Sequence, residues 1–196
     1  MRHEVRQWEA GRKDIRGFFR DTLGYAEVDL SAQPHPCELT GALVIDRARG
    51  IGFCGLSERC DEAGAARMHE AFGLRATLMF DLAPGEYHTN VLLAVLAGRA
   101  AAVHPGGLVS PGIVPALQAL YAGRVVELTG TEQAAFAGNA IALVPGVVWM
   151  SRRAHDALRP VVVAQLEDAG FAVRSVPLDA LEAGGGSLRC CVAEVF

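Results

Sequence analysis

The sequence lacks any dense run of Lys or Arg. Its 196 residues include 18 Lys and Arg against 22 Asp and Glu, and the formal net charge is -4. Electrostatic binding of nucleic acid or of an anionic membrane requires a concentration of positive charge. We therefore expect no nucleic acid and no membrane among the partners of this protein.

Long apolar runs are also missing. The longest, residues 139–150, is too short to span a bilayer and is broken by Pro145 and Gly146. The first four residues, from Met1 to Glu4, lack the apolar core of a secretion signal. These absences predict a soluble, cytoplasmic protein.

Cysteine is sparse. There are five cysteines, an odd number, and none has Cys-x-x-Cys spacing. The pattern indicates neither a disulfide framework nor a zinc knuckle, and we expect reduced thiols.

Apolar side chains, by contrast, make up 51% of the sequence. A chain of this length and composition can bury a substantial core. We expect one globular domain that spans residues 1–196.

A pattern of strand, strand, helix, strand recurs along the chain, with a period of roughly 45 to 50 residues. Short apolar runs indicate the strands, and glycines follow the helices as stop signals. The predicted copies are 41–46, 51–56, 61–72 and 75–82; then 90–96, 99–104, a helix from Ser110-Pro111 to Gly123, and 124–128; then 140–144, 147–151, 155–169 and 172–178. Pro160 predicts a kink in the third helix, or its true start after a preliminary turn.

The two ends of the chain do not complete a copy. Before the first copy, the spacing of apolar residues predicts a helix with Ile15, Phe18, Phe19 and Leu23 on one face, and a short strand over 25–30 follows. After the third copy only one strand, 188–196, is expected. Repeated units bury their faces against neighbours, so we expect an incomplete ring with N-terminal sequence missing.

Four polar or reactive residues stand at corresponding places in these units: Glu38, Arg59, His88 and Cys190. Each has an ordinary structural interpretation when taken alone. Such a Glu is commonly solvated, an Arg at a strand end forms surface ion pairs, and a His or Cys is often a structural residue. Three glycines, 184–186, precede Cys190, and such a loop can present a nucleophilic thiol.

Taken together, in this order and on this repeat, these residues resemble the guanidino-group modifying superfamily. It includes arginine deiminases, dimethylarginine dimethylaminohydrolases and amidinotransferases. The resemblance covers the whole chain and is greatest to the amidinotransferase or arginine-deiminase-related branch, which includes citrulline hydrolases. It implies an α/β propeller, the pentein fold, incomplete at the N-terminus. The implied function is a hydrolase acting on the guanidino or ureido carbon of an arginine- or citrulline-like substrate.

The resemblance also implies roles for individual residues. The Gly-Gly-x-x-Arg-Cys motif corresponds to the segment that ends at Cys190, which is the implied nucleophile. The His-x-Asp motif corresponds to His88 and Asn90, so His88 is the implied general acid and base. Glu38 is the implied carboxylate that holds substrate nitrogens and orients the histidine, and Arg59 is the implied partner of a substrate carboxylate.

The sequence departs from the family pattern at two positions. Asn90 replaces the usual aspartate, which removes a negative charge and favours a neutral ureido group over a cation. Leu39 replaces a glycine. Asn139 matches a further family position, which we interpret as structural.

The implied chemistry is attack by the Cys190 thiolate on a planar carbon, with proton transfer by His88. The protein itself supplies the nucleophile, so we expect no cofactor and no metal. The expected partner is a small amino-acid substrate.

Two alternatives remain open. An amidinotransferase would use the same residues, with an amine in place of water. A catalytically impaired, truncated propeller would act as a binding or assembly protein. The incomplete ring also predicts self-association into a homo-oligomer.

Overall fold

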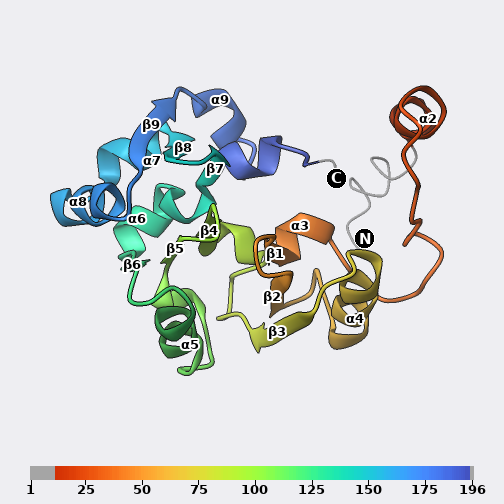
Figure 1. The fold of residues 1–196 in the computed structure, drawn as a ribbon, viewed down its shortest axis with the longest axis horizontal. Helices are drawn as coiled ribbons and strands as arrows, with labels where there is room; N and C mark the ends of the chain where they lie inside the picture. Colours follow the sequence, from red (N-terminus) through yellow and green to blue (C-terminus); the bar gives the residue numbers. More distant parts are fainter. Residues whose placement is uncertain (1–11, 195–196) are drawn as a thin grey trace.

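The computed structural model describes residues 12–194. Its strands form three three-stranded sheets that follow one another along the chain (Figure 1). In every sheet the first two strands are antiparallel, and the third runs parallel to the second, which lies in the middle. The strands are β1 (Leu43–Asp46), β2 (Ile51–Leu56), β3 (Ala76–Asp81), β4 (Leu93–Leu96), β5 (Ala100–Val103), β6 (Val125–Glu127), β7 (Ile141–Val144), β8 (Val147–Ser151) and β9 (Ala172–Val176). The predicted α/β propeller built from repeated units is confirmed.

Helices connect the second and third strands of each sheet, as a parallel crossover requires. They are α4 (Glu62–Ala71), α5 (Ile113–Leu120), and in the third unit α7 (Arg152–Ala157) and α8 (Pro160–Asp168). The Asp61 side chain caps α4 by accepting from the Gly64 amide. Pro160 is the first residue of α8, so the predicted late start of this helix is confirmed.

Ser110 and Pro111 do not open α5. The helix begins at Ile113, and the Ile113 amide donates to the Ser110 carbonyl across a turn. The prediction was wrong because proline suits the second position of a turn as well as the first turn of a helix.

Short helices precede the hairpins. These are α3 (Leu39–Ala42) before β1, η2 (Thr89–Val91) before β4 and η4 (Ala137–Asn139) before β7. A fourth, η5 (Leu188–Cys191), follows the third unit. We call these four segments the entry helices. The other short helices are η3 (Pro105–Gly107), α6 (Gly130–Ala134) and α9 (Asp179–Glu182).

Two predicted strands are absent from the described residues. Residues 25–30 and 192–194 form no ladder with another strand, and residues 188–191 are helical. Residues 195–196 lie outside the described range. Apolar character predicted strands here, but a strand also requires a hydrogen-bonded neighbour.

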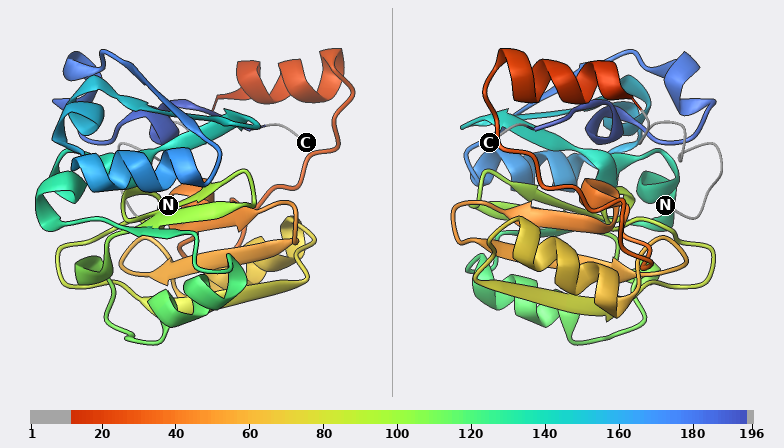
Figure 2. Two further views of the ribbon diagram at one scale, coloured as in Figure 1. Left: turned by 60° about the vertical axis from the view of Figure 1, so that its left-hand side comes forward. Right: turned by 90° about the vertical axis from the view of Figure 1, so that its right-hand side faces the viewer.

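The N-terminal helix lies apart from the sheets (Figures 1 and 2). It consists of α2 (Lys13–Gly17) and the π-helical η1 (Phe18–Thr22), and Gly24 follows with a φ of 72°. The side chains of Ile15, Phe18 and Leu23 are exposed. The predicted apolar face therefore exists, but it covers no sheet in this structure.

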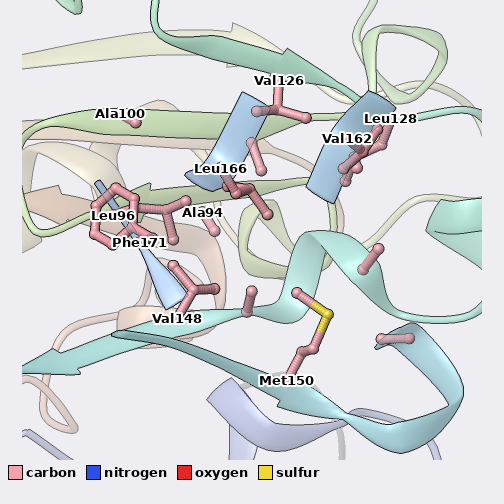
Figure 3. Close-up of a cluster of buried hydrophobic side chains, with 14 residues drawn as sticks. Ala94, Leu96, Ala100, Val126, Leu128, Val148, Met150, Val162, Leu166 and Phe171 are labelled. Carbon is pink, nitrogen blue, oxygen red and sulfur yellow. The ribbon is translucent and has the colours of Figure 1, made fainter. Parts of the chain in front are cut away.

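The core consists of three apolar clusters, two of which lie between neighbouring units. One joins the first and second sheets through Phe53, Phe80 and Leu93. Another joins the second and third units, where β4, β5 and β6 pack on β8 and α8 (Figure 3). Each fully buried Leu or Val contributes roughly 1.5 to 3 kcal/mol. The units therefore stabilise one another, as the repeat predicts.

A buried carboxylate adds a polar link between the first two units. Asp46, at the end of β1, is fully buried. It accepts from the Tyr121 hydroxyl at 2.9 Å and from Arg49 Nη1 at 2.8 Å, and Arg49 Nη1 also donates to the Gly98 carbonyl. Burial, and then the charge of Asp46, raises the pKa of Tyr121 above its ordinary range, so the hydroxyl remains a donor.

We predict that Asp46→Ala lowers the free energy of unfolding by about 2 to 3 kcal/mol, because it removes the charged acceptor of the buried Tyr121 hydroxyl and of the half-buried Arg49 guanidinium. Tyr121→Phe removes only one donor and costs about 1 kcal/mol. Urea denaturation measures both. The control is Glu70→Ala in the exposed Arg67–Glu70 pair, expected within about 0.5 kcal/mol of the parent chain. Equal losses for Asp46→Ala and Glu70→Ala would contradict the prediction.

Candidate active site

The entry helices bring together most of the residues singled out in the sequence. Glu38 directly precedes α3, His88 directly precedes η2, and Cys190 lies in η5. Together they line a pocket of about 190 Å³. This is smaller than the roughly 300 to 1,000 Å³ of sites for drug-sized ligands, and suits a small polar group. The lining residues are Glu38, Leu39, Thr40, Gly41, His88, Asn90, Arg189, Cys190 and Val192.

An imidazole and a carboxylate are paired on one side of the pocket. His88 Nε2 lies 2.8 Å from Glu38 Oε2, and both side chains are buried. An ionised carboxylate only accepts, so Nε2–H donates to it and the ring orientation is set. Thr89 anchors the neighbouring backbone, since its hydroxyl accepts from the Gly55 amide and donates to the Ala42 carbonyl.

Backbone conformation brings α3 close to the histidine. A Cβ at Gly41 would lie 2.6 Å from His88 Cε1, so only glycine fits here without a shift of the ring. Leu39 has a φ of 37°, a left-handed conformation that is strained for leucine, and its side chain is exposed at the pocket.

Arg59 is not among the lining residues. Its Nη1 lies 3.3 Å from both carboxylate oxygens of Glu38, its Nε donates to Glu58, and its guanidinium lies over the Tyr87 ring. Burial works to lower the pKa of Arg59, but the Glu58 and Glu38 carboxylates outweigh it and raise the pKa above the ordinary value. In this structure Arg59 therefore compensates the charge of Glu38.

The cysteine of the pocket follows a glycine-rich loop. Gly185 and Gly186 have φ values of 86° and 87°, so the loop before η5 depends on glycine. The Ser187 hydroxyl donates to Glu182 at 2.6 Å, and both residues are buried. Cys190 and Cys191 are both exposed, but only Cys190 lines the pocket.

Asn139 is a site residue whose role the sequence did not reveal. It is buried, and its side chain contacts Asn90, Arg189 and Cys190. Two signals in the sequence could have indicated more than a structural role: its match to a family position, and its place at a hairpin entry, as for Asn90.

A second cation, Arg189, borders the pocket. Its guanidinium donates to the Val192 carbonyl at 3.0 Å and to Glu194 at 2.9 Å, and Arg47 also pairs with Glu194. Over residues 12–194, no group of three or more His, Cys, Asp or Glu side chains is arranged to hold a metal. None of the helices in this range has the length and apolar character needed to cross a bilayer.

The site geometry predicts that Gly41→Ala displaces the His88 ring from Glu38. Overpacking of this kind costs about 1 to 3 kcal/mol of unfolding free energy. The measurements are urea denaturation and the NMR shifts of the His88 ring. Gly112→Ala is the matched control, because a Cβ there meets nothing within 4 Å. Unchanged His88 shifts in Gly41→Ala would contradict the prediction.

The family model and the curated relative that match this chain are both dimethylarginine hydrolases. A family model of eukaryotic-type N,N-dimethylarginine dimethylhydrolase matches residues 1–196. The N(G),N(G)-dimethylarginine dimethylaminohydrolase of Mycobacterium tuberculosis is 29% identical over 190 residues, which are 95% of this chain and 57% of the relative. The chain thus spans little more than half the length of this curated relative.

Solved structures share the fold. The N-terminal domain of a variant of ArgZ, the arginine dihydrolase of the cyanobacterial ornithine–ammonia cycle, is 20% identical with a TM-score of 0.81. The alignment covers 96% of this chain and 66% of that one. A dimethylarginine dimethylaminohydrolase variant, as an adduct with S-methyl-L-thiocitrulline, is 19% identical with a TM-score of 0.57, over 76% of this chain and 53% of that one.

These structures have the pentein fold that the family resemblance implies. Because the family model matches the chain from end to end, the chain belongs to the N,N-dimethylarginine dimethylhydrolase family of guanidino-group modifying enzymes.

Proposed function

We propose that this chain is a hydrolase that acts on the guanidino or ureido carbon of a small amino-acid substrate through a covalent cysteine intermediate. One observation carries the proposal. A thiol, an imidazole and a carboxylate, from Cys190, His88 and Glu38, line one small pocket although they lie far apart in the sequence. This set supplies a nucleophile, a proton-transfer group and an orienting charge.

The reaction has two halves. In the first, the Cys190 thiolate attacks the planar carbon, and the bond from that carbon to the departing nitrogen breaks. The protonated His88 gives its proton to the departing amine. In the second half, neutral His88 takes a proton from water, and the resulting hydroxide breaks the bond between carbon and sulfur. The thiolate is regenerated, and His88 is again protonated.

Glu38 has two roles in this proposal. Its contact with His88 Nε2 favours the protonated imidazole that the first half needs. Its other oxygen accepts N–H groups of the substrate. Arg59 balances the charge of Glu38, and its role with a substrate carboxylate remains a prediction from family resemblance.

The names of the relatives support this chemistry. One solved structure is a variant of the arginine dihydrolase ArgZ covalently bonded to a reaction intermediate, and another is an adduct of a dimethylarginine dimethylaminohydrolase with S-methyl-L-thiocitrulline. Both proteins act on guanidino compounds by name. This chain covers 66% of the first solved chain and 53% of the second, and the assays below test its own activity.

We predict that Cys190→Ala lowers the release of ammonia or amine from arginine, dimethylarginine and citrulline by about a thousandfold or more, because the nucleophile is lost. Cys191→Ala is the matched control and retains activity, since Cys191 does not line the pocket. Steady-state assays on the full chain measure both.

Activity that survives Cys190→Ala would overturn the covalent mechanism. A parent chain that releases no amine from any of the three substrates would overturn the hydrolase, and would favour a binding or assembly role.

The charge of the pocket supports a neutral ureido substrate over a cation. Glu38 is the only carboxylate among the described lining residues, and Arg59 compensates it. Asn90 adds a neutral amide that offers an acceptor and a donor, which matches the oxygen and nitrogen of a ureido group.

We therefore predict that the parent chain prefers citrulline to arginine, and that Asn90→Asp moves this preference toward arginine by about ten- to a hundredfold. The magnitude is that of one charge-assisted hydrogen bond, about 1.5 to 3 kcal/mol. The ratio of kcat/KM for the two substrates measures it. Arginine preferred by the parent chain, or a ratio unmoved by Asn90→Asp, would contradict the charge argument.

A further inference from the structure

We infer that Asn139 is a further site residue, an inference that rests on the proposed function. Asn139 holds the Cys190 loop in place. It also donates a hydrogen bond to the Cys190 sulfur, which favours the thiolate. The Asn139 side chain has contacts on both sides of its amide. They tie the second and third units to η5, the segment that carries the cysteine.

The carbonyl side of the amide holds the loop backbone. Asn139 Oδ1 accepts from the Arg189 amide at 3.0 Å and from the Cys190 amide at 3.4 Å. Successive backbone N–H groups at the start of a short helix lack partners within the helix. Asn139 supplies a partner to the Arg189 amide and a second acceptor to the Cys190 amide, which also donates to the Ser187 carbonyl at 3.1 Å. A side chain from another unit thus helps to hold the backbone at Cys190.

The nitrogen side of the amide faces the reactive atom. Asn139 Nδ2 donates to the Asn90 carbonyl at 2.7 Å and to Cys190 Sγ at 3.3 Å. The partners of the Asn139 amide determine which end is oxygen and which is nitrogen. The two backbone N–H groups on one side need an acceptor, Oδ1, and the backbone carbonyl on the other side needs a donor, Nδ2. The remaining N–H therefore points at the sulfur, and a thiolate accepts it better than a thiol.

Close approach of two entry helices makes this arrangement possible. A Cβ at Gly138 would lie 2.4 Å from the Val91 carbonyl oxygen, so η4 reaches η2 only with glycine at that position. Asn139 is itself almost fully buried, at 1% exposure. A buried amide with all its groups bonded is held rigidly, which suits a positioning role.

The titratable or charged side chains that line the pocket with Cys190 are Glu38, His88 and Arg189. All three are retained in the variants proposed below. A change in the pH dependence of Cys190 therefore reports the loss of the Asn139 donor.

The test is the alkylation of Cys190 by iodoacetamide as a function of pH, in a Cys191→Ser background of the full chain, with mass spectrometry of the modified peptide. Asn139→Asp keeps acceptors for the loop amides but has no N–H for the sulfur. Asn139→Ala removes the donor without adding a charge. We expect both to raise the pH of half-maximal rate by about one unit, and as a result to lower the alkylation rate at pH 7 by up to about tenfold.

Tyr121→Phe is the control, because it removes a buried hydrogen bond far from the pocket and leaves the profile unchanged. An unchanged profile in a folded Asn139→Asp or Asn139→Ala chain would overturn the inference.

If neither variant folds, chains that keep Asn139 still test the inference. Cys190 in the Cys191→Ser chain must react faster at pH 7 than Cys191 in the Cys190→Ser chain, and equal rates would overturn the inference. Alkylation needs no turnover. A chain that fails to hydrolyse any substrate but shows the expected profiles would therefore overturn the proposed function and leave the inference about Asn139 intact.

Discussion

The packing of each three-stranded unit against the next is the constraint on which the pocket depends. Apolar side chains on the sheets and the crossover helices are buried between units, and this burial determines how far one entry helix lies from the next. Glycine at position 138 permits η4 to approach η2. The packing of the apolar core therefore sets the positions of the site residues. Most of the site residues contribute little to that core themselves.

The polar contacts of the site form two sets. Arg59 pairs with Glu38, and Glu38 with His88. Asn139 contacts Cys190. Glu38 has a cation beside it, and the Asn139 amide has its donors and acceptors bonded, which keeps the cost of burying these polar groups low. No buried side-chain nitrogen or oxygen among the described residues lacks a partner.

One of the four described non-glycine residues with a positive φ lies at the pocket, and the other three, Ala97, Ala122 and Phe136, do not line it. Leu39 has a left-handed backbone at the pocket, and Gly185 and Gly186 bend the loop before the cysteine. A strained leucine costs of order 1 to 3 kcal/mol, and the surrounding structure must offset that cost. Such strain is commonly found at functional sites, and it supports the proposal that this pocket is the active site.

The amino-acid sequence by itself determined the repeat and most of the approximate strand and helix ranges, and it marked Pro160 as either a kink or a late helix start, because periodicity, glycine stops and proline geometry are local properties. Family resemblance singled out Glu38, His88 and Cys190. Only the tertiary structure decided that Arg59 faces Glu38 and that Asn139 contacts Cys190, 51 residues away in sequence. Such contacts depend on how neighbouring units pack, and no local pattern records them. For the same reason residues 25–30 and 192–194 read as strands but form none, since a strand needs a partner that its own sequence cannot supply.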